Sequence, residues 1–147
     1  MLAAVTVAAC VRTGARPVAP VLEEVIRGRP AVTFAAALQA VTDKGLPLRQ
    51  SDLDAGLIET NYVDLASYDP LGAGDYPVAE RQVRFRLVIA PDTASIGSRV
   101  AIFVVYTPFR TGISTSERNE RAIPRDHPGM AIARELRDRT KRSVEGQ

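Results

Sequence analysis

Apolar side chains recur along part of the chain with the period of an α-helix. Between residues 31 and 44, Phe34, Ala37, Leu38 and Val41 fall at positions i, i+3, i+4 and i+7. This spacing places them on one stripe of a helix with 3.6 residues per turn. A proline precedes the segment, and a glycine suited to a left-handed cap follows it. The pattern therefore predicts an amphipathic helix over residues 31–44.

A second helix is predicted near the end of the sequence, over residues 128–142. Met130, Ala133 and Leu136 recur there with helical spacing and can face a sheet. Asp126 precedes this stretch and is the expected N-cap, because a carboxylate at that position can accept a backbone hydrogen bond.

Alternation with a period of two predicts strands elsewhere. It indicates five of them, over residues 21–26, 46–50, 57–63, 80–90 and 100–106. Residues 51–56 and 91–98 supply turn residues, so the last four strands should form two hairpins. The final strand is apolar on both faces and belongs in the middle of the sheet or under a helix. Gln82, Arg84 and Arg86 are predicted to face solvent.

The order strand, helix, four strands, helix is typical of an α+β domain with an antiparallel sheet of about five strands. The chain has 147 residues, of which 46% are hydrophobic and 24% charged, as is usual for one globular domain. We assign this domain to residues 21–147. Polar stretches at residues 64–79 and 110–125 are expected to be loops.

The only cysteine, Cys10, ends an uncharged run of small and apolar residues. Residues 7–10 (VAAC) resemble the lipobox of bacterial lipoproteins, a family in which the chain is cut before the cysteine and the thiol receives a diacylglyceryl group. The resemblance implies a signal peptide over residues 1–9 and a lipidated tether over residues 10–20, since the apolar run is too short to span a bilayer. The next residue is Val11, not aspartate, which resembles lipoproteins sent to the outer membrane, facing the periplasm. The alternative is an unmodified thiol.

The alanine-rich helix, the Gly45 break and residues 50–60 (QSDLDAGLIET) resemble the repeated domain of the BamC family of bacterial outer-membrane lipoproteins. That resemblance implies a helix-grip-like fold, in which a long helix packs on a curved antiparallel sheet. It also implies a non-catalytic interaction domain with a protein partner and an accessory role in outer-membrane assembly. A domain of this shape can also enclose an apolar cavity, so binding of a small hydrophobic ligand is the alternative function.

Residues with catalytic or metal-binding chemistry are few. His127 is the only histidine, and Ser114 and Ser116 lie outside any G-x-S-x-G pattern. Asp52 and Asp54 fit a turn better than a calcium loop, because the required glycine and closing glutamate are missing. We therefore expect no enzyme activity, no cofactor and no metal.

Five basic side chains gather in the second predicted helix, namely Arg134, Arg137, Arg139, Lys141 and Arg142. Beside a lipid anchor they can contact anionic headgroups, although basic residues near a helix C-terminus also favour the helix dipole and solvate an exposed face. The whole chain carries a net charge of only +2 and has no tryptophan. Nucleic acid is therefore not an expected partner.

Overall fold

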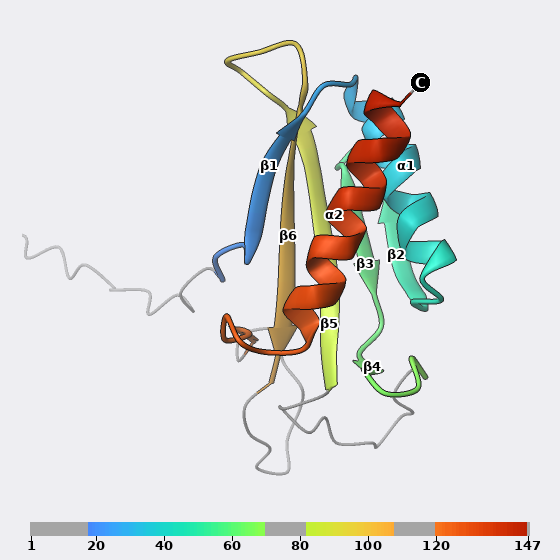
Figure 1. Ribbon diagram of the computed structural model, residues 1–147, viewed down its shortest axis with the longest axis vertical. Helices are drawn as coiled ribbons and strands as arrows, with labels where there is room; N and C mark the ends of the chain where they lie inside the picture. Colours follow the sequence, from blue (N-terminus) through green and yellow to red (C-terminus); the bar gives the residue numbers. More distant parts are fainter. Residues whose placement is uncertain (1–17, 70–81, 108–119, 147) are drawn as a thin grey trace, which may run out of the picture.

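Two helices lie side by side on one face of an antiparallel sheet in the computed structural model, which describes residues 18–69, 82–107 and 120–146 (Figure 1). The strands are β1 (Leu22–Ile26), β2 (Leu48–Asp52), β3 (Leu57–Thr60), β4 (Val63–Asp64), β5 (Gln82–Pro91), β6 (Ser98–Tyr106) and β7 (Arg121–Ala122). The main path runs β1-β6-β5-β3-β2, with β4 added to β5 and β7 added to β6. The predicted α+β class and antiparallel sheet are confirmed, and β6 lies inside the sheet as expected.

The two helices are α1 (Pro30–Asp43) and α2 (Gly129–Glu145). For α1 the prediction holds to within one residue, and Gly45 adopts the left-handed conformation, with φ of 76°. The predicted Asp126 cap of α2 is wrong. Pro128 is the N-cap, and the Gly129 N–H instead donates a hydrogen bond of 3.0 Å to Nδ1 of His127.

Strand boundaries differ from the prediction around the first hairpin. The strand predicted over residues 46–50 is Leu48–Asp52 and contains a β-bulge, and the one predicted over residues 57–63 ends at Thr60. Val63–Asp64 forms the separate strand β4, which pairs with the first residues of β5. The chain therefore breaks its strand after β3 and pairs with β5 a second time through β4. Local alternation does not predict this break, because it depends on pairing with a distant strand.

The predicted loops are described only in part. β7 forms within the stretch predicted as a polar loop, because its two residues pair with Val105 and Tyr106 of β6. The portions at residues 70–81 and 108–119 lie outside the described residues.

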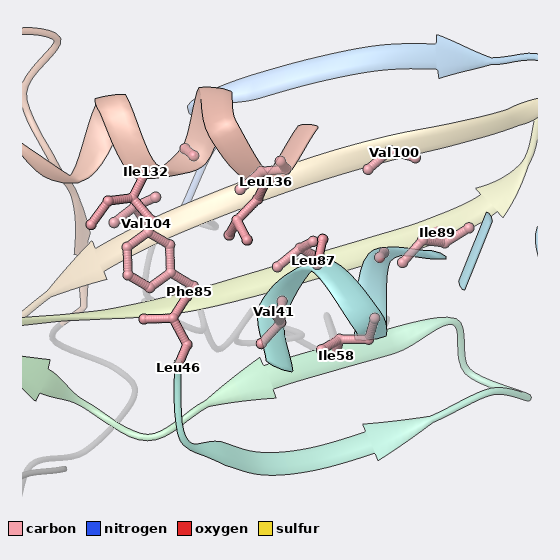
Figure 2. Packing of buried hydrophobic residues seen from close by; sticks show 14 of the residues in the cluster. Val41, Leu46, Ile58, Phe85, Leu87, Ile89, Val100, Val104, Ile132 and Leu136 are labelled. Carbon is pink, nitrogen blue, oxygen red and sulfur yellow. The ribbon is translucent and has the colours of Figure 1, made fainter. Parts of the chain in front are cut away.

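Side chains from both helices and the inner face of the sheet fill one core (Figure 2). Val41 of α1, Leu136 of α2 and Phe85 of β5 are all fully buried. The small side chains of Ala37 and Ala40 allow α1 to approach the sheet closely. The contact between α1 and the sheet therefore consists largely of small and branched apolar side chains.

The entry to β1 and the turn between β5 and β6 lie at opposite ends of the sheet. The chain enters β1 at one end, whereas the turn between β5 and β6 lies at the other end, next to Ile26, which pairs with Ser98 (Figure 1). Of the helices in the described part, none is long and apolar enough to cross a membrane.

Candidate functional site

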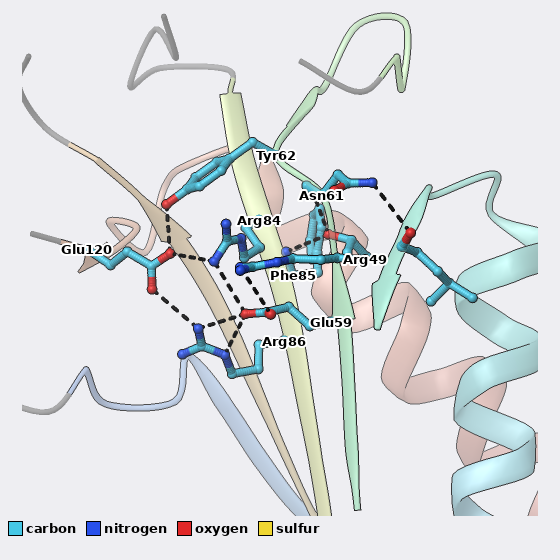
Figure 3. Close-up of polar contacts among 10 residues, drawn as sticks. Arg49, Glu59, Asn61, Tyr62, Arg84, Phe85, Arg86 and Glu120 are labelled. Atoms are coloured by element: carbon cyan, nitrogen blue, oxygen red, sulfur yellow. Dashed lines mark hydrogen bonds and ion pairs between the residues drawn. The ribbon is translucent and has the colours of Figure 1, made fainter. Parts of the chain in front are cut away.

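A cluster of charged side chains lies on the face of the sheet opposite the helices (Figure 3). Successive side chains of a strand point to opposite faces, so Arg84 and Arg86 project away from the core that Phe85 enters. Glu59 of β3 is the cross-strand neighbour of Arg86. Glu120, just before β7, completes the group. We call Glu59, Tyr62, Arg84, Arg86 and Glu120 the open-face cluster.

The open-face cluster is held by a chain of ion pairs. Arg86 donates to Glu59 Oε1 from Nε at 3.0 Å and from Nη2 at 2.7 Å. Arg84 Nη1 lies 3.4 Å from Glu59 Oε1 and 3.1 Å from Glu120 Oε1. The prediction that Arg84 faces solvent is wrong, because these carboxylates pair with it and leave it only 9% exposed.

Tyr62 joins the cluster through its hydroxyl and its ring. The hydroxyl donates to Glu120 Oε1 at 2.7 Å and lies 3.0 Å from Oγ1 of Thr107. The Arg84 guanidinium carbon is 4.4 Å from the ring centroid, within the range of a cation–π contact. Burial, as the largest cause, raises the pKa of Tyr62 well above its ordinary value, so the phenol stays protonated near neutral pH.

The open-face cluster has the chemistry of a structural network. Glu59 and Glu120 each accept hydrogen bonds from arginine, and Arg49 of β2 adds a further contact to Glu59 at 3.4 Å. These links join β2, β3, β5 and the segment before β7. No group of three or more His, Cys, Asp or Glu side chains among the described residues could hold a metal ion.

The structure brings none of the described candidate residues from the sequence into the open-face cluster. Cys10, Ser114 and Ser116 lie outside the described residues. Asp52 Oδ1 accepts a hydrogen bond of 3.0 Å from the Ala55 N–H, which confirms its predicted role in the turn.

The five basic residues predicted to contact an anionic surface lie along α2. Lys141 and Arg137 both pair with Glu24 of β1, and Arg139 pairs with Glu135 at 2.8 Å. Arg134 and Arg142 are exposed. Part of the basic charge is thus neutralised within the domain, and contact with an anionic surface stays a prediction.

A second surface lies at the β5–β6 turn and was not singled out from the sequence. Ile96 is 98% exposed and Val25 of β1 is 40% exposed. Together with Arg27, Arg29, Gly28 and Ser95 these residues line a surface hollow of about 550 Å³. We call Val25, Arg27, Arg29 and Ile96 the tip surface. The available signal was Ile96 itself, a large apolar residue between Ser95 and Gly97 in a turn.

The turn that carries Ile96 is held by its own hydrogen bonds. The Asp92 N–H donates to the Gly97 carbonyl at 3.0 Å, and Ser95 Oγ donates to Asp92 Oδ2 at 2.5 Å. The hydrogen bond from Ser95, aided by the guanidinium of Arg99, lowers the pKa of Asp92 below its ordinary value and keeps it ionised. Ile96 therefore lies exposed on a turn that is held by hydrogen bonds.

Neither a protein-family model nor a curated protein matches the sequence. The functional argument therefore depends on the residues and geometry described above.

Proposed function

We propose that the chain is a lipid-anchored lipoprotein of the cell envelope, held at the outer membrane on the periplasmic side by lipid on Cys10. Its α+β domain binds a partner protein without catalysing a reaction. The lipobox-like residues 7–10 support the anchor. The observation that carries the interaction role is the tip surface, which lies at the end of the fold opposite to the entry of the chain into β1 (Figure 1).

The tether limits where the domain can lie. Residues 11–22 connect Cys10 to the start of β1 and span at most about 40 Å when extended at ~3.3–3.6 Å per residue. Two or more acyl chains on one cysteine are sufficient for stable membrane attachment. A domain tethered in this way holds one end of its sheet toward the anchor and presents the tip surface to other proteins.

An exposed apolar side chain favours association with a partner. Burying an isoleucine side chain is worth about 1.5–3 kcal/mol, which the isolated domain does not gain at Ile96. The open-face cluster, by contrast, uses its charges within the domain. The tip surface is therefore the better candidate for contact with another molecule.

Membrane fractionation with mass spectrometry tests the anchor. We expect the wild-type protein in the membrane fraction with a diacylglyceryl group on Cys10, and the Cys10→Ser variant in the soluble fraction. The double variant Cys10→Ser, Ser143→Cys is the matched control, since it keeps one cysteine but moves it to an exposed position on α2. An unmodified Cys10, or membrane attachment that survives Cys10→Ser, would contradict the proposal.

A further inference from the structure

We infer that the tip surface binds an extended segment of a partner protein that carries both apolar and acidic residues. This inference rests on the proposed interaction function and names the chemistry of the partner. It is carried by three features of the same place: exposed apolar side chains, exposed guanidinium groups and an edge strand of the sheet.

The apolar contact comes from Ile96 and Val25. Both line the hollow of about 550 Å³, and Val25 together with Arg27 also borders a neighbouring hollow toward the end of α2. Because the turn around Ile96 is held by hydrogen bonds, little ordering is needed before a partner can cover it. The hollow that Val25 and Ile96 both line suits an apolar side chain of a bound segment.

The positive charge comes from Arg27 and Arg29, which are both exposed. Within the described part of the chain, neither guanidinium forms an ion pair, although the Arg27 backbone N–H donates a hydrogen bond of 3.4 Å to Oε1 of Glu145. Arg99, in the same region, differs because it pairs with Glu23 at 2.7 Å and Asp92 at 3.0 Å. Guanidinium groups bind carboxylates with paired hydrogen bonds, so the charge complement of this hollow is an acidic side chain.

Among the residues that the structure describes, β1 ends the main path of the sheet and is therefore an edge strand. An edge strand can accept a further strand, whose alternate side chains point to opposite faces. Val25, Arg27 and Ile96 line the same hollow, so a segment that lies along β1 can place apolar side chains near Val25 and Ile96 and an acidic side chain near Arg27. A lipid surface is less favoured as the occupant, because the tip surface lies at the opposite end from the tethered entry to β1 (Figure 1).

A binding experiment on the full chain carrying Cys10→Ser tests the inference. The probes are fluorescent eight-residue peptides that alternate Leu, Ile, Val or Phe with Asp or Glu, and the same panel with Lys in place of the acidic residues. We expect saturable binding by members of the acidic panel, amide shifts at Val25, Arg27 and Ile96 in NMR spectra, and no saturable binding by the Lys panel.

Variants of the tip surface should weaken that binding. Ile96→Ser and Arg27→Ala are each expected to raise the Kd of the best acidic peptide by roughly tenfold. The matched controls are Leu53→Ser, which removes an apolar residue 55% exposed in the other hairpin turn, and Arg125→Ala, which removes another exposed arginine. Both controls should leave the Kd unchanged.

Three outcomes would overturn the inference: no saturable binding by any acidic peptide, equal binding by the Lys panel, or equal loss in the controls. Ile96-dependent sedimentation with vesicles of phosphatidylglycerol and phosphatidylcholine, without peptide binding, would also overturn it and assign the surface to a membrane. None of these results depends on lipid at Cys10, so failure here is separate from failure of the anchor.

Discussion

Glu59 and Arg86 face each other directly across β3 and β5, and the Arg86 guanidinium donates two hydrogen bonds to one carboxylate oxygen of Glu59, at 3.0 and 2.7 Å. The Glu59 side chain is only 2% exposed. Removing it would leave the arginine charges partly buried with fewer partners. We expect Glu59→Ala to lower the free energy of unfolding by about 3–5 kcal/mol, measured by urea denaturation.

A neighbouring exposed pair provides the control for Glu59. Glu23 and Arg99 lie on the same face of the sheet and are joined at 2.7 Å, but their side chains are 42% and 47% exposed. Glu23→Ala should hardly change the free energy of unfolding, because water solvates the remaining charge. Equal destabilisation by both substitutions would show that burial does not set the importance of Glu59.

Two glycines with positive φ should respond differently to alanine. Gly45 and Gly56 have φ of 76° and 63°. A Cβ at Gly45 would meet nothing within 4 Å, whereas one at Gly56 would lie 2.0 Å from the Ile89 carbonyl oxygen. Gly45→Ala is expected to lower the free energy of unfolding by about 1–2 kcal/mol through left-handed backbone strain. Gly56→Ala should lower it by more, because a backbone clash is added, and thermal unfolding of both variants measures the difference.

Both glycines lie where the sequence predicts a change of chain direction. Gly45 follows the predicted helix and Gly56 ends the predicted turn over residues 51–56, and local residue types are sufficient for both predictions. The burial of Arg84 was predicted wrongly because one of its partners, Glu120, is 36 residues away. Local alternation indicates which face a side chain takes, but it does not reveal which distant charge will cover that face.

The tip surface was missed for a related reason. Ile96 is visible in the sequence as an apolar residue in a turn, but isolated apolar residues on surfaces are common. Its neighbours in space are Val25 of β1 and Arg27, which follows β1 directly. The pairing of Ile26 with Ser98 brings this segment beside the turn. The site could be recognised only once the register of β1 against β6 was known.

The ion pair between Lys44 and Glu135 should make stability depend on pH. Nζ and Oε2 are 2.6 Å apart and join the end of α1 to α2. The hydrogen bond from Lys44 is the main reason why the pKa of Glu135 lies below its ordinary value of 4.5, and the bond to Glu135 likewise raises the pKa of Lys44 above 10.5. The stabilisation is therefore fully present between those two ordinary values. It is lost as the pH falls through the lowered pKa of Glu135 or rises through the raised pKa of Lys44.

Glu135→Gln tests that dependence. Because both side chains are partly exposed, we expect a loss of about 0.2–1 kcal/mol in the free energy of unfolding at pH 7. The difference from wild type should shrink when urea denaturation is repeated below about pH 3, where carboxylates are mostly protonated. A difference that stays constant across this range would indicate that the substitution acts through packing and not through charge.

Thr33 in the first turns of α1 offers a substitution that should increase stability. Its side chain is fully buried, and Oγ1 has no hydrogen-bond partner in the described part of the chain. Valine has nearly the same shape and a similar helix propensity, so Thr33→Val removes a desolvated hydroxyl without opening a cavity. We expect the free energy of unfolding to rise by about 1 kcal/mol.

Thr140→Val is the matched control in α2, because the buried Thr140 hydroxyl donates to the Leu136 carbonyl at 2.8 Å. Loss of that hydrogen bond should lower the free energy of unfolding or leave it unchanged. A stabilising effect of equal size at both positions would show that the missing hydrogen bond at Thr33 is not the cause.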